Sequence, residues 1–280
     1  MSSTTLGLAM RISVLITASF TVASCAMAPT PPTSPSEVPE IRKGTGYLTG
    51  YLTQLEMPRS DQFLPEAPRS QAPGSSDEIG ARAAFATRGQ PRWVLAASDA
   101  DLKFPAAARV FSCALGFEPD AIRTPHLYML LRRSMADAGL STYAAKNRYN
   151  RVRPFVALKE LSCTPQEEDF LSKDGSYPSG HAAVGWAWAL ILSDLAPMRR
   201  EALLRRGYAF GQSRVSCGVH WQSDVDAGRV VGAASVTVIR QNSVFRAQLE
   251  LARREVATLP VSGENSLPHC AEESSTLVNF

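Results

Sequence analysis

The sequence predicts an all-α protein that folds as a single-domain helical bundle. Residues 182–195 are apolar nearly all round and include Trp186 and Trp188, which is typical of a helix buried in a core. Several other segments carry apolar residues at three- and four-residue spacing, the period of an amphipathic helix. No run of alternating β-branched residues bounded by hairpin turns is present. The 280 residues suffice for one domain with a full core.

The N-terminus has the pattern of an export signal. Arg11 precedes uncharged residues 12–23, a stretch too short to span a bilayer but long enough for a signal-peptide core, so residues 1–24 are predicted to be a signal peptide. Residues 22–25 resemble a lipobox, which would leave Cys25 lipidated, whereas Ala26-Met27-Ala28 fits a cleavage site that releases a soluble protein. Both alternatives predict a periplasmic or secreted protein, and the first an outer-membrane lipoprotein. The Pro-, Ser- and Thr-rich residues 25–45 are predicted to be a flexible tether.

Residues 46–259 are predicted to form the helical domain. It opens with a short amphipathic stretch at residues 46–57, and helices are expected over residues 77–87, 105–115, 124–138, 182–195, 224–239 and 243–259. Pro125 follows Thr124 at a favoured first-turn position. Residues 260–280, which contain Pro260, Gly263 and Pro268, are predicted to be an irregular tail.

Four cysteines follow Cys25 and bear on the compartment: Cys113, Cys163, Cys217 and Cys270. An even number in an exported protein indicates disulfides, with three possible pairings. The alternative is that Cys113 and Cys217, both in apolar surroundings, are buried thiols. The sequence leaves this choice open.

Charge and hydropathy limit the classes of partner. The net charge of +3 gives no reason to expect a nucleic acid polymer or a membrane surface. No stretch of about 20 apolar residues follows the N-terminal segment, so no transmembrane span is predicted. The expected partner is a small molecule.

Three segments carry residues suited to phosphate chemistry, and the first is residues 146–154, Lys-Asn-Arg-Tyr-Asn-Arg-Val-Arg-Pro. On a helix a separation of seven residues is close to two turns, so Lys146 and Arg153 are expected to point the same way. Pro154 disfavours helix at Arg153 and places that guanidinium near a helix end. Arg148 and Arg151 are expected to be solvated. By itself such a run is most often a wet helix surface.

The second segment is residues 175–181, Gly-Ser-Tyr-Pro-Ser-Gly-His, directly before the buried helix. A helix start offers unpaired N–H groups, here including that of Gly180, which bind anions readily. Ser179 can cap the helix or donate its hydroxyl to the anion, and His181 is then held beside it. Taken alone, the segment is more typical of an ordinary capped helix.

The third segment is residues 213–224. His220 and Asp224 are four residues apart, so on a helix the carboxylate can accept a hydrogen bond from one imidazole nitrogen. That contact fixes the tautomer and leaves the other nitrogen as a nucleophile. Arg214 adds a planar donor fork suited to phosphate, whereas Asp226 is expected to face elsewhere. A lone His–Asp pair is more often a structural hydrogen bond.

Together the three segments have one economical use. Two arginines and a lysine surround a dianion, a helix start donates N–H groups, one histidine attacks and another donates a proton. The sequence has only four histidines with which to do this by chance: His126, His181, His220 and His269.

The patterns K-x6-RP, PSGH and SR-x5-H-x3-D, in this order and intact at every defining position, resemble the tripartite motif of the type 2 phosphatidic acid phosphatase superfamily. The residues around the second and third segments are similar to those of the class A bacterial non-specific acid phosphatases. The resemblance is strong over residues 146–251, weaker over residues 45–145 and absent from the tail. One departure is Ala182-Ala183 after PSGH, where relatives often have a hydroxyl residue.

The resemblance implies a metal-independent acid phosphatase, without a cofactor, that hydrolyses a broad range of phosphate monoesters, nucleotides among them, through a phosphohistidine. It makes His220 the nucleophile, Asp224 the residue that orients it, and His181 first the acid and then the base. The phosphate oxygens would be bound by five groups: Lys146, Arg153, Arg214, Ser179 and the Gly180 N–H. An acidic optimum is expected because His181 must start protonated, and phosphotransferase activity and a homo-oligomer remain open.

Three other functions fit less well. A vanadium-dependent haloperoxidase shares this fold and oxyanion site, but usually has a longer gap between the lysine and the RP pair than the six residues found here. A membrane lipid phosphatase of the superfamily needs several transmembrane spans. A non-enzymatic phosphate-binding lipoprotein needs neither a nucleophile nor an acid, so His220 and His181 argue against it.

Overall fold

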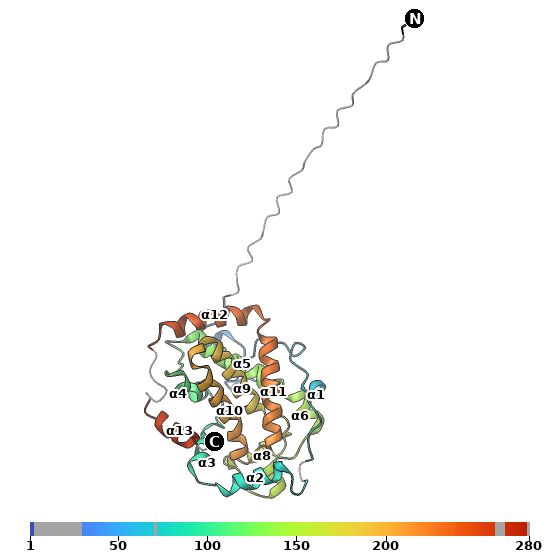
Figure 1. Ribbon diagram of the computed structural model, residues 1–280, viewed down its shortest axis with the longest axis vertical. Helices are drawn as coiled ribbons and strands as arrows, with labels where there is room; N and C mark the ends of the chain where they lie inside the picture. The colour runs from blue at the N-terminus through green and yellow to red at the C-terminus, as the bar shows by residue number, and fades with distance from the viewer. Residues whose placement is uncertain (3–29, 70–71, 261–266, 279–280) are drawn as a thin grey trace.

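The computed structural model describes residues 1–2, 30–69, 72–260 and 267–278, and within these ranges the chain is helical and has no β-strand (Figure 1). One isolated antiparallel bridge joins Glu40 to Leu48. The all-α prediction is therefore confirmed. Cys25 and most of the predicted signal peptide fall in residues 3–29, outside the described residues.

Helix α9 (Gly180–Leu195) forms the centre of the bundle, and none of its residues is exposed. It packs against α10 (Arg200–Ser216), α11 (Gln222–Ile239) and α5 (Pro125–Leu140). Helix α12 (Ser243–Thr258) lies across one end of the bundle (Figure 1). Because α9 is apolar on all sides, burying it on all sides removes the most hydrophobic surface from water.

Two glycines let the neighbouring helices approach α9 closely. A Cβ at Gly207 of α10 would overlap Ala189, and a Cβ at Gly228 of α11 would overlap the carbonyl oxygen of Ser179. Only glycine fits such backbone contacts. The second contact places the start of α11 beside the start of α9, where the second and third sequence segments meet.

The remaining helices are short: α1 (Ser60–Phe63), α2 (Ser76–Ala86), α3 (Pro91–Ser98), α4 (Ser112–Leu115), α6 (Tyr143–Tyr149), α7 (Pro154–Leu158), α8 (Glu168–Leu171) and α13 (Cys270–Leu277). Single 3-10 turns occupy Pro35–Glu37, Ala106–Phe111, Pro165–Glu167 and Pro197–Arg199. The helix expected over residues 105–115 is thus split into a 3-10 turn and α4. None of the helices in the described part of the chain is both long and apolar enough to span a membrane.

Helix α10 was not expected from the sequence. Its buried face contains Arg206 and Arg214 together with Gly207, Gly211 and Ser213, so its apolar periodicity is weak. The stretch at residues 46–57, expected to be amphipathic, is instead irregular. The N–H groups of Tyr51 and Leu52 donate to Asp137 of α5 at 2.8 and 2.9 Å, which satisfies this backbone without a helix.

Both ends of the domain differ from the expected boundaries. Within the predicted tether, Val38 is buried against Leu48 and Met129, and Gln248 donates to the carbonyl of Pro32 at 3.2 Å. Residues 30–45 therefore belong to the packed domain. Apolar contacts and a buried amide hold this segment, which composition alone does not reveal.

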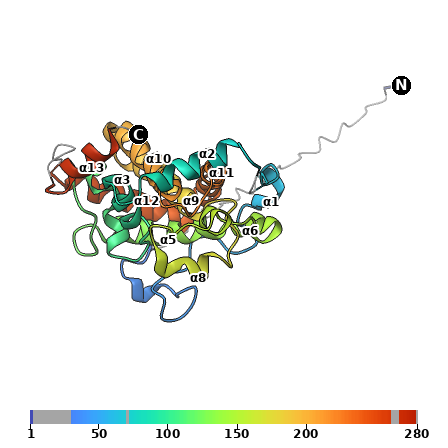
Figure 2. The same ribbon diagram turned by 90° about the horizontal axis from the view of Figure 1, so that it is seen from below.

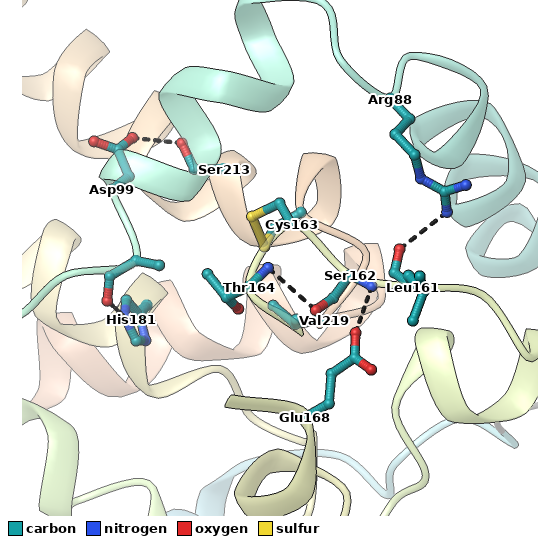
Figure 3. Close-up of a disulfide and its surroundings, with 12 residues drawn as sticks. Arg88, Asp99, Leu161, Ser162, Cys163, Thr164, Glu168, His181, Ser213 and Val219 are labelled. Atoms are coloured by element: carbon teal, nitrogen blue, oxygen red, sulfur yellow. Dashed lines mark hydrogen bonds between the residues drawn. A yellow bond between two sulfur atoms is a disulfide. The ribbon is translucent and has the colours of Figure 1, made fainter. Parts of the chain in front are cut away.

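The C-terminal segment contains α13, where an irregular tail was expected, and a disulfide attaches it to the bundle. Cys270 pairs with Cys113, which joins α13 to α4. The second disulfide pairs Cys163 with Cys217, so the alternative of buried thiols at Cys113 and Cys217 is wrong (Figure 3). A chain of 157 residues separates the partners of the first bond, so only the folded structure brings them together.

Candidate active site

The structure brings the three sequence segments together around one cavity of about 290 Å³. Helices α5, α6 and α8, the start of α9, α10 and the loop before α11 contribute to its wall, and α5 and α8 lie on the same side of the bundle as the N-terminal segment (Figure 2). Six predicted site residues line it: Lys146, Arg153, Gly180, His181, Arg214 and His220. Ser179 and Asp224 lie directly behind the lining and are fully buried.

Lys146 and Arg153 converge, but not because they share a helix. Helix α6 ends at Tyr149, since Asn150 adopts a left-handed conformation with φ of 41°, and Arg153 is the N-cap of α7. The two cations meet at Asp174, whose Oδ2 accepts from Lys146 Nζ at 3.0 Å and from Arg153 Nη2 at 2.9 Å. Lys146 also donates to the carbonyl of Gly175. One carboxylate thus holds both side chains in place.

The charge on Lys146 is sensitive to its surroundings. Burial, together with the positive charge of Arg153, lowers the pKa of Lys146 to about 8, although Asp174 acts in the opposite direction. A bound dianion would favour the charged ammonium. The lysine is therefore suited to bind an anion at neutral or acidic pH and to release it in alkali.

The start of α9 is built as an anion site. Ser179 is the N-cap, and its Oγ accepts from the Ala182 N–H at 3.3 Å. The Ser179 N–H donates to the backbone carbonyl of Asp224 at 2.9 Å, which ties the start of α9 to the third segment. Gly180 is the first helical residue, whose N–H has no intrahelical acceptor, and it lines the cavity.

Arg214 is the clearest sign of a ligand. Its side chain is only 1% exposed, and its Nε and Nη1 make no hydrogen bond within the described residues. Burial lowers the pKa of Arg214 to about 10. A buried guanidinium with unpaired donors at a cavity wall costs free energy unless an anion binds there.

His220 faces the cavity from the loop before α11. Its Nδ1 lies 3.4 Å from Asp224 Oδ2, and its Nε2 lies 3.0 Å from Arg153 Nη1. Since an arginine can only donate, Nε2 accepts, and Nδ1 carries the proton that points to Asp224. The two residues do not share a helix as expected, because α11 begins at Gln222, but the four-residue spacing still brings them together.

Asp224 is held by partners that the sequence did not identify. Its Oδ2 accepts from the Trp221 N–H at 2.9 Å, and its Oδ1 accepts from Arg151 Nη1 at 2.5 Å. Arg151 also donates to Asp77 of α2 at 2.8 Å. The expectation that Arg151 is solvated is wrong: its side chain is buried because it neutralises two carboxylates.

Burial sets the protonation of the reacting groups. It lowers the pKa of His220 well below the ordinary histidine value, with further lowering by Arg153, and it lowers that of His181 similarly, with further lowering by Arg214. Burial also raises the pKa of Asp224, against the effect of Arg151. His220 is therefore neutral, as a nucleophile must be, into the acidic range.

His181 stands at the start of α9 with its ring fixed on two sides. Its Nε2 donates to the carbonyl of Ala100 at 2.9 Å (Figure 3), and its ring stacks on Phe210 with centroids 6.1 Å apart. Like His220 and Arg214 it lines the cavity. The arrangement therefore presents one histidine, one Asp-oriented histidine and three cations to the same space.

The mouth of the cavity is apolar. It is lined by Ile41, Tyr47, Leu102, Phe170 and Leu171, and the side chain of Phe170 is 67% exposed. Polar groups lie at the bottom and apolar groups at the rim, so a ligand would place an anionic end inward and its remainder among these side chains.

The structure adds several residues to the sequence prediction: Asp174, Arg151 and Asp77 in the charge network, and the apolar rim. Asp174 directly precedes the second segment, so a carboxylate next to an anion motif was its available signal. The rim side chains come from separate segments and carry no shared sequence pattern.

Comparisons with known proteins agree with this geometry. The family model described as the PAP2 superfamily matches residues 127–247. The chain is 46% identical over 173 residues, 61% of its length, to the non-specific acid phosphatase of Providencia stuartii, covering 70% of that protein. It is 41% identical over 203 residues, 72% of its length, to the non-specific acid phosphatase of Salmonella typhimurium, covering 81%. An acid phosphatase of Zymomonas mobilis is 41% identical over 169 residues, 60% of this chain and 64% of the relative.

Proposed function

Because this chain belongs to the PAP2 superfamily, and within it to the class A bacterial acid phosphatases, we propose that it hydrolyses phosphate monoesters by transferring the phosphoryl group to His220. The observation that carries the proposal is the hydrogen-bonding of His220: Nδ1 points to Asp224 and Nε2 faces the cavity. A neutral imidazole oriented in this way has a lone pair available for attack on phosphorus.

In the first half-reaction, Nε2 of His220 forms a bond to phosphorus as the bond from phosphorus to the ester oxygen breaks. The leaving oxygen takes a proton from His181 and departs as an alcohol. Lys146, Arg153 and Arg214, with the N–H of Gly180, stabilise the charge on the phosphoryl oxygens. These cations supply the charge that a metal ion supplies in other phosphatases, so the proposed reaction is metal-independent.

In the second half-reaction, water attacks the phosphohistidine. His181, now neutral, accepts a proton from the water, and the bond between phosphorus and Nε2 of His220 breaks. Inorganic phosphate leaves, and His181 is protonated again for the next cycle. The acid of the first step is thus the base of the second.

The expected substrates are monoesters of varied structure, nucleotides among them, because the rim offers apolar contacts and few directional ones. Export to the periplasm or beyond, with or without a lipid at Cys25, agrees with the two disulfides, which persist in oxidising compartments.

The test is hydrolysis of p-nitrophenyl phosphate at mildly acidic pH in excess EDTA by the wild type and by His220→Ala. Activity that survives EDTA and is lost in the variant, together with an acid-labile phosphoryl group trapped on His220 of the wild type by rapid quenching, is the expected result. Activity that persists in His220→Ala would show that the nucleophile is another residue. Activity that EDTA abolishes and a divalent ion restores would overturn metal independence.

A further inference from the structure

Asp99 is a buried carboxylate outside the phosphate cavity that connects to two groups inside it. It follows α3 as the C-cap, is 2% exposed and is absent from the cavity lining. Its Oδ2 accepts from Ser213 Oγ at 2.5 Å (Figure 3). Arg206 donates to both of its oxygens, at 2.6 and 3.2 Å. The carboxylate is therefore fixed in position by three hydrogen bonds.

The first connection runs to His181. The residue after Asp99 is Ala100, whose carbonyl oxygen lies 2.9 Å from His181 Nε2 (Figure 3). Because a carbonyl can only accept, Nε2 must carry a hydrogen, and Nδ1 is the nitrogen that can gain or release a proton. The side chain of Asp99 holds the peptide group that selects this tautomer.

The second connection runs to Arg214. Ser213, which donates to Asp99, directly precedes Arg214 in α10, and its Oγ also accepts from Arg92 Nη1 at 2.9 Å. Fixing Ser213 fixes the turn of helix from which the Arg214 side chain reaches the cavity.

Three residues of α10 act on one face. Arg206, Phe210 and Ser213 are spaced four and three apart, so they project from the same side of the helix. Arg206 and Ser213 contact Asp99, and Phe210 stacks on His181. Glu273 of α13 lies 3.2 Å from Arg206 Nε and adds a negative charge to this buried network.

We propose that Asp99 is a positioning residue for the phosphatase reaction, which orients His181 through the carbonyl of Ala100 and Arg214 through Ser213. The inference rests on the proposed role of His181 as the general acid. Loss of its orientation must slow substrates in proportion to how much their leaving group needs a proton. Loss of the Arg214 position must weaken the binding of phosphate itself.

The test compares kcat of Asp99→Asn on p-nitrophenyl phosphate, whose leaving group departs readily, and on glycerol phosphate, whose alkoxide needs protonation. The amide keeps the shape of the side chain, but its nitrogen cannot accept from Ser213. Since a general acid contributes about 10²- to 10⁴-fold, misorienting it is expected to reduce kcat about tenfold more on glycerol phosphate than on the aryl ester. The inhibition constant of inorganic phosphate is expected to rise.

Two variants separate the connections from a general loss of stability. Ser213→Ala removes only the contact toward Arg214, so it is expected to raise the phosphate inhibition constant and leave the ratio of the two kcat values unchanged. Asp137→Asn changes another buried carboxylate, which binds the Tyr51 and Leu52 N–H groups. It is expected to lower Tm and leave both the ratio and the inhibition constant unchanged.

His181→Ala distinguishes the failure of this inference from that of the proposed function. If His181→Ala shows the leaving-group dependence and Asp99→Asn matches Asp137→Asn, the positioning role is overturned and the general acid stands. If His181→Ala shows no such dependence, both are wrong. If Asp99→Asn does not fold, Arg206→Lys, which weakens the contacts to the same carboxylate, must show a smaller change of the same kind, and an unchanged ratio and inhibition constant overturn the inference.

Discussion

Replacing Arg151 by methionine removes the counter-ion of the carboxylate that orients His220. The guanidinium side chain is 2% exposed and lies 2.5 Å from Asp224 Oδ1 and 2.8 Å from Asp77 Oδ2. Methionine keeps the apolar stem but leaves Asp224 buried and unpaired. Breaking a buried pair in this way costs about 3–5 kcal/mol, or about 6–20 °C in Tm for a domain of this size.

The assay is urea unfolding of Arg151→Met and of Arg148→Met, a matched control from the same basic segment. Arg148 is exposed and donates only to the carbonyl of Asp61 at 3.3 Å, so its replacement is expected to change the free energy of unfolding by less than about 0.5 kcal/mol. Equal unfolding free energies for the two variants would refute the assignment of Arg151 as the partner of Asp224.

The destabilisation also has a predicted pH dependence. Burial raises the pKa of Asp224 and Arg151 lowers it, so the variant raises it further. A carboxyl whose folded pKa lies above its unfolded value destabilises the fold at high pH and regains that free energy by binding a proton as the pH falls. The difference between the two variants is therefore expected to be smaller at pH 4 than at pH 7. A difference that grows toward pH 4 contradicts this reasoning.

Catalysis should follow the same group. With Asp224 protonated, His220 loses the acceptor that fixes its tautomer, so kcat of folded Arg151→Met is expected to fall by at least about 100-fold at mildly acidic pH. The loss should lessen as the pH rises and Asp224 ionises. Full activity at acidic pH in the folded variant would show that the charge on Asp224 does not orient His220.

The inhibition constant of inorganic phosphate is expected to rise above pH 8, by up to about tenfold per pH unit, because Lys146 has a pKa of about 8 and loses its charge there; Lys146→Arg should remove the effect, and a constant that stays flat to pH 10 in the wild type would contradict it. Replacing Cys163 and Cys217 by serine is expected to lower kcat as well as Tm, because Cys217 lies three residues before His220; unchanged kcat in the folded variant contradicts this. Replacing Cys113 and Cys270 is expected to reduce the free energy of unfolding by about 2–5 kcal/mol with a smaller effect on kcat, checked by urea unfolding of both pairs.

The long helices could be predicted from the sequence because each carries its own periodic signal. Residues 182–195 are apolar throughout, and the helix expected there is α9. Residues 243–259 are amphipathic and form α12. Helix α10 escaped prediction because its buried face is made of arginines and small residues, which become favourable inside only when partners such as Asp99 are present.

The sequence by itself determined which residue types could handle phosphate, because the motif positions are fixed in spacing: Lys146 with Arg153, Ser179 to His181, and Arg214 with His220 and Asp224. The four-residue step from His220 to Asp224 is short enough to pair the two side chains even though no helix spans both.

Only the tertiary structure decided which charges neutralise one another. Arg151 meets Asp77 across 74 residues, and Arg206 meets Asp99 across 107 residues. Cys113 and Cys270, 157 residues apart, are paired in the same way. Local patterns report the face of a helix, whereas a buried charge is stable only beside a partner that packing delivers from elsewhere in the chain.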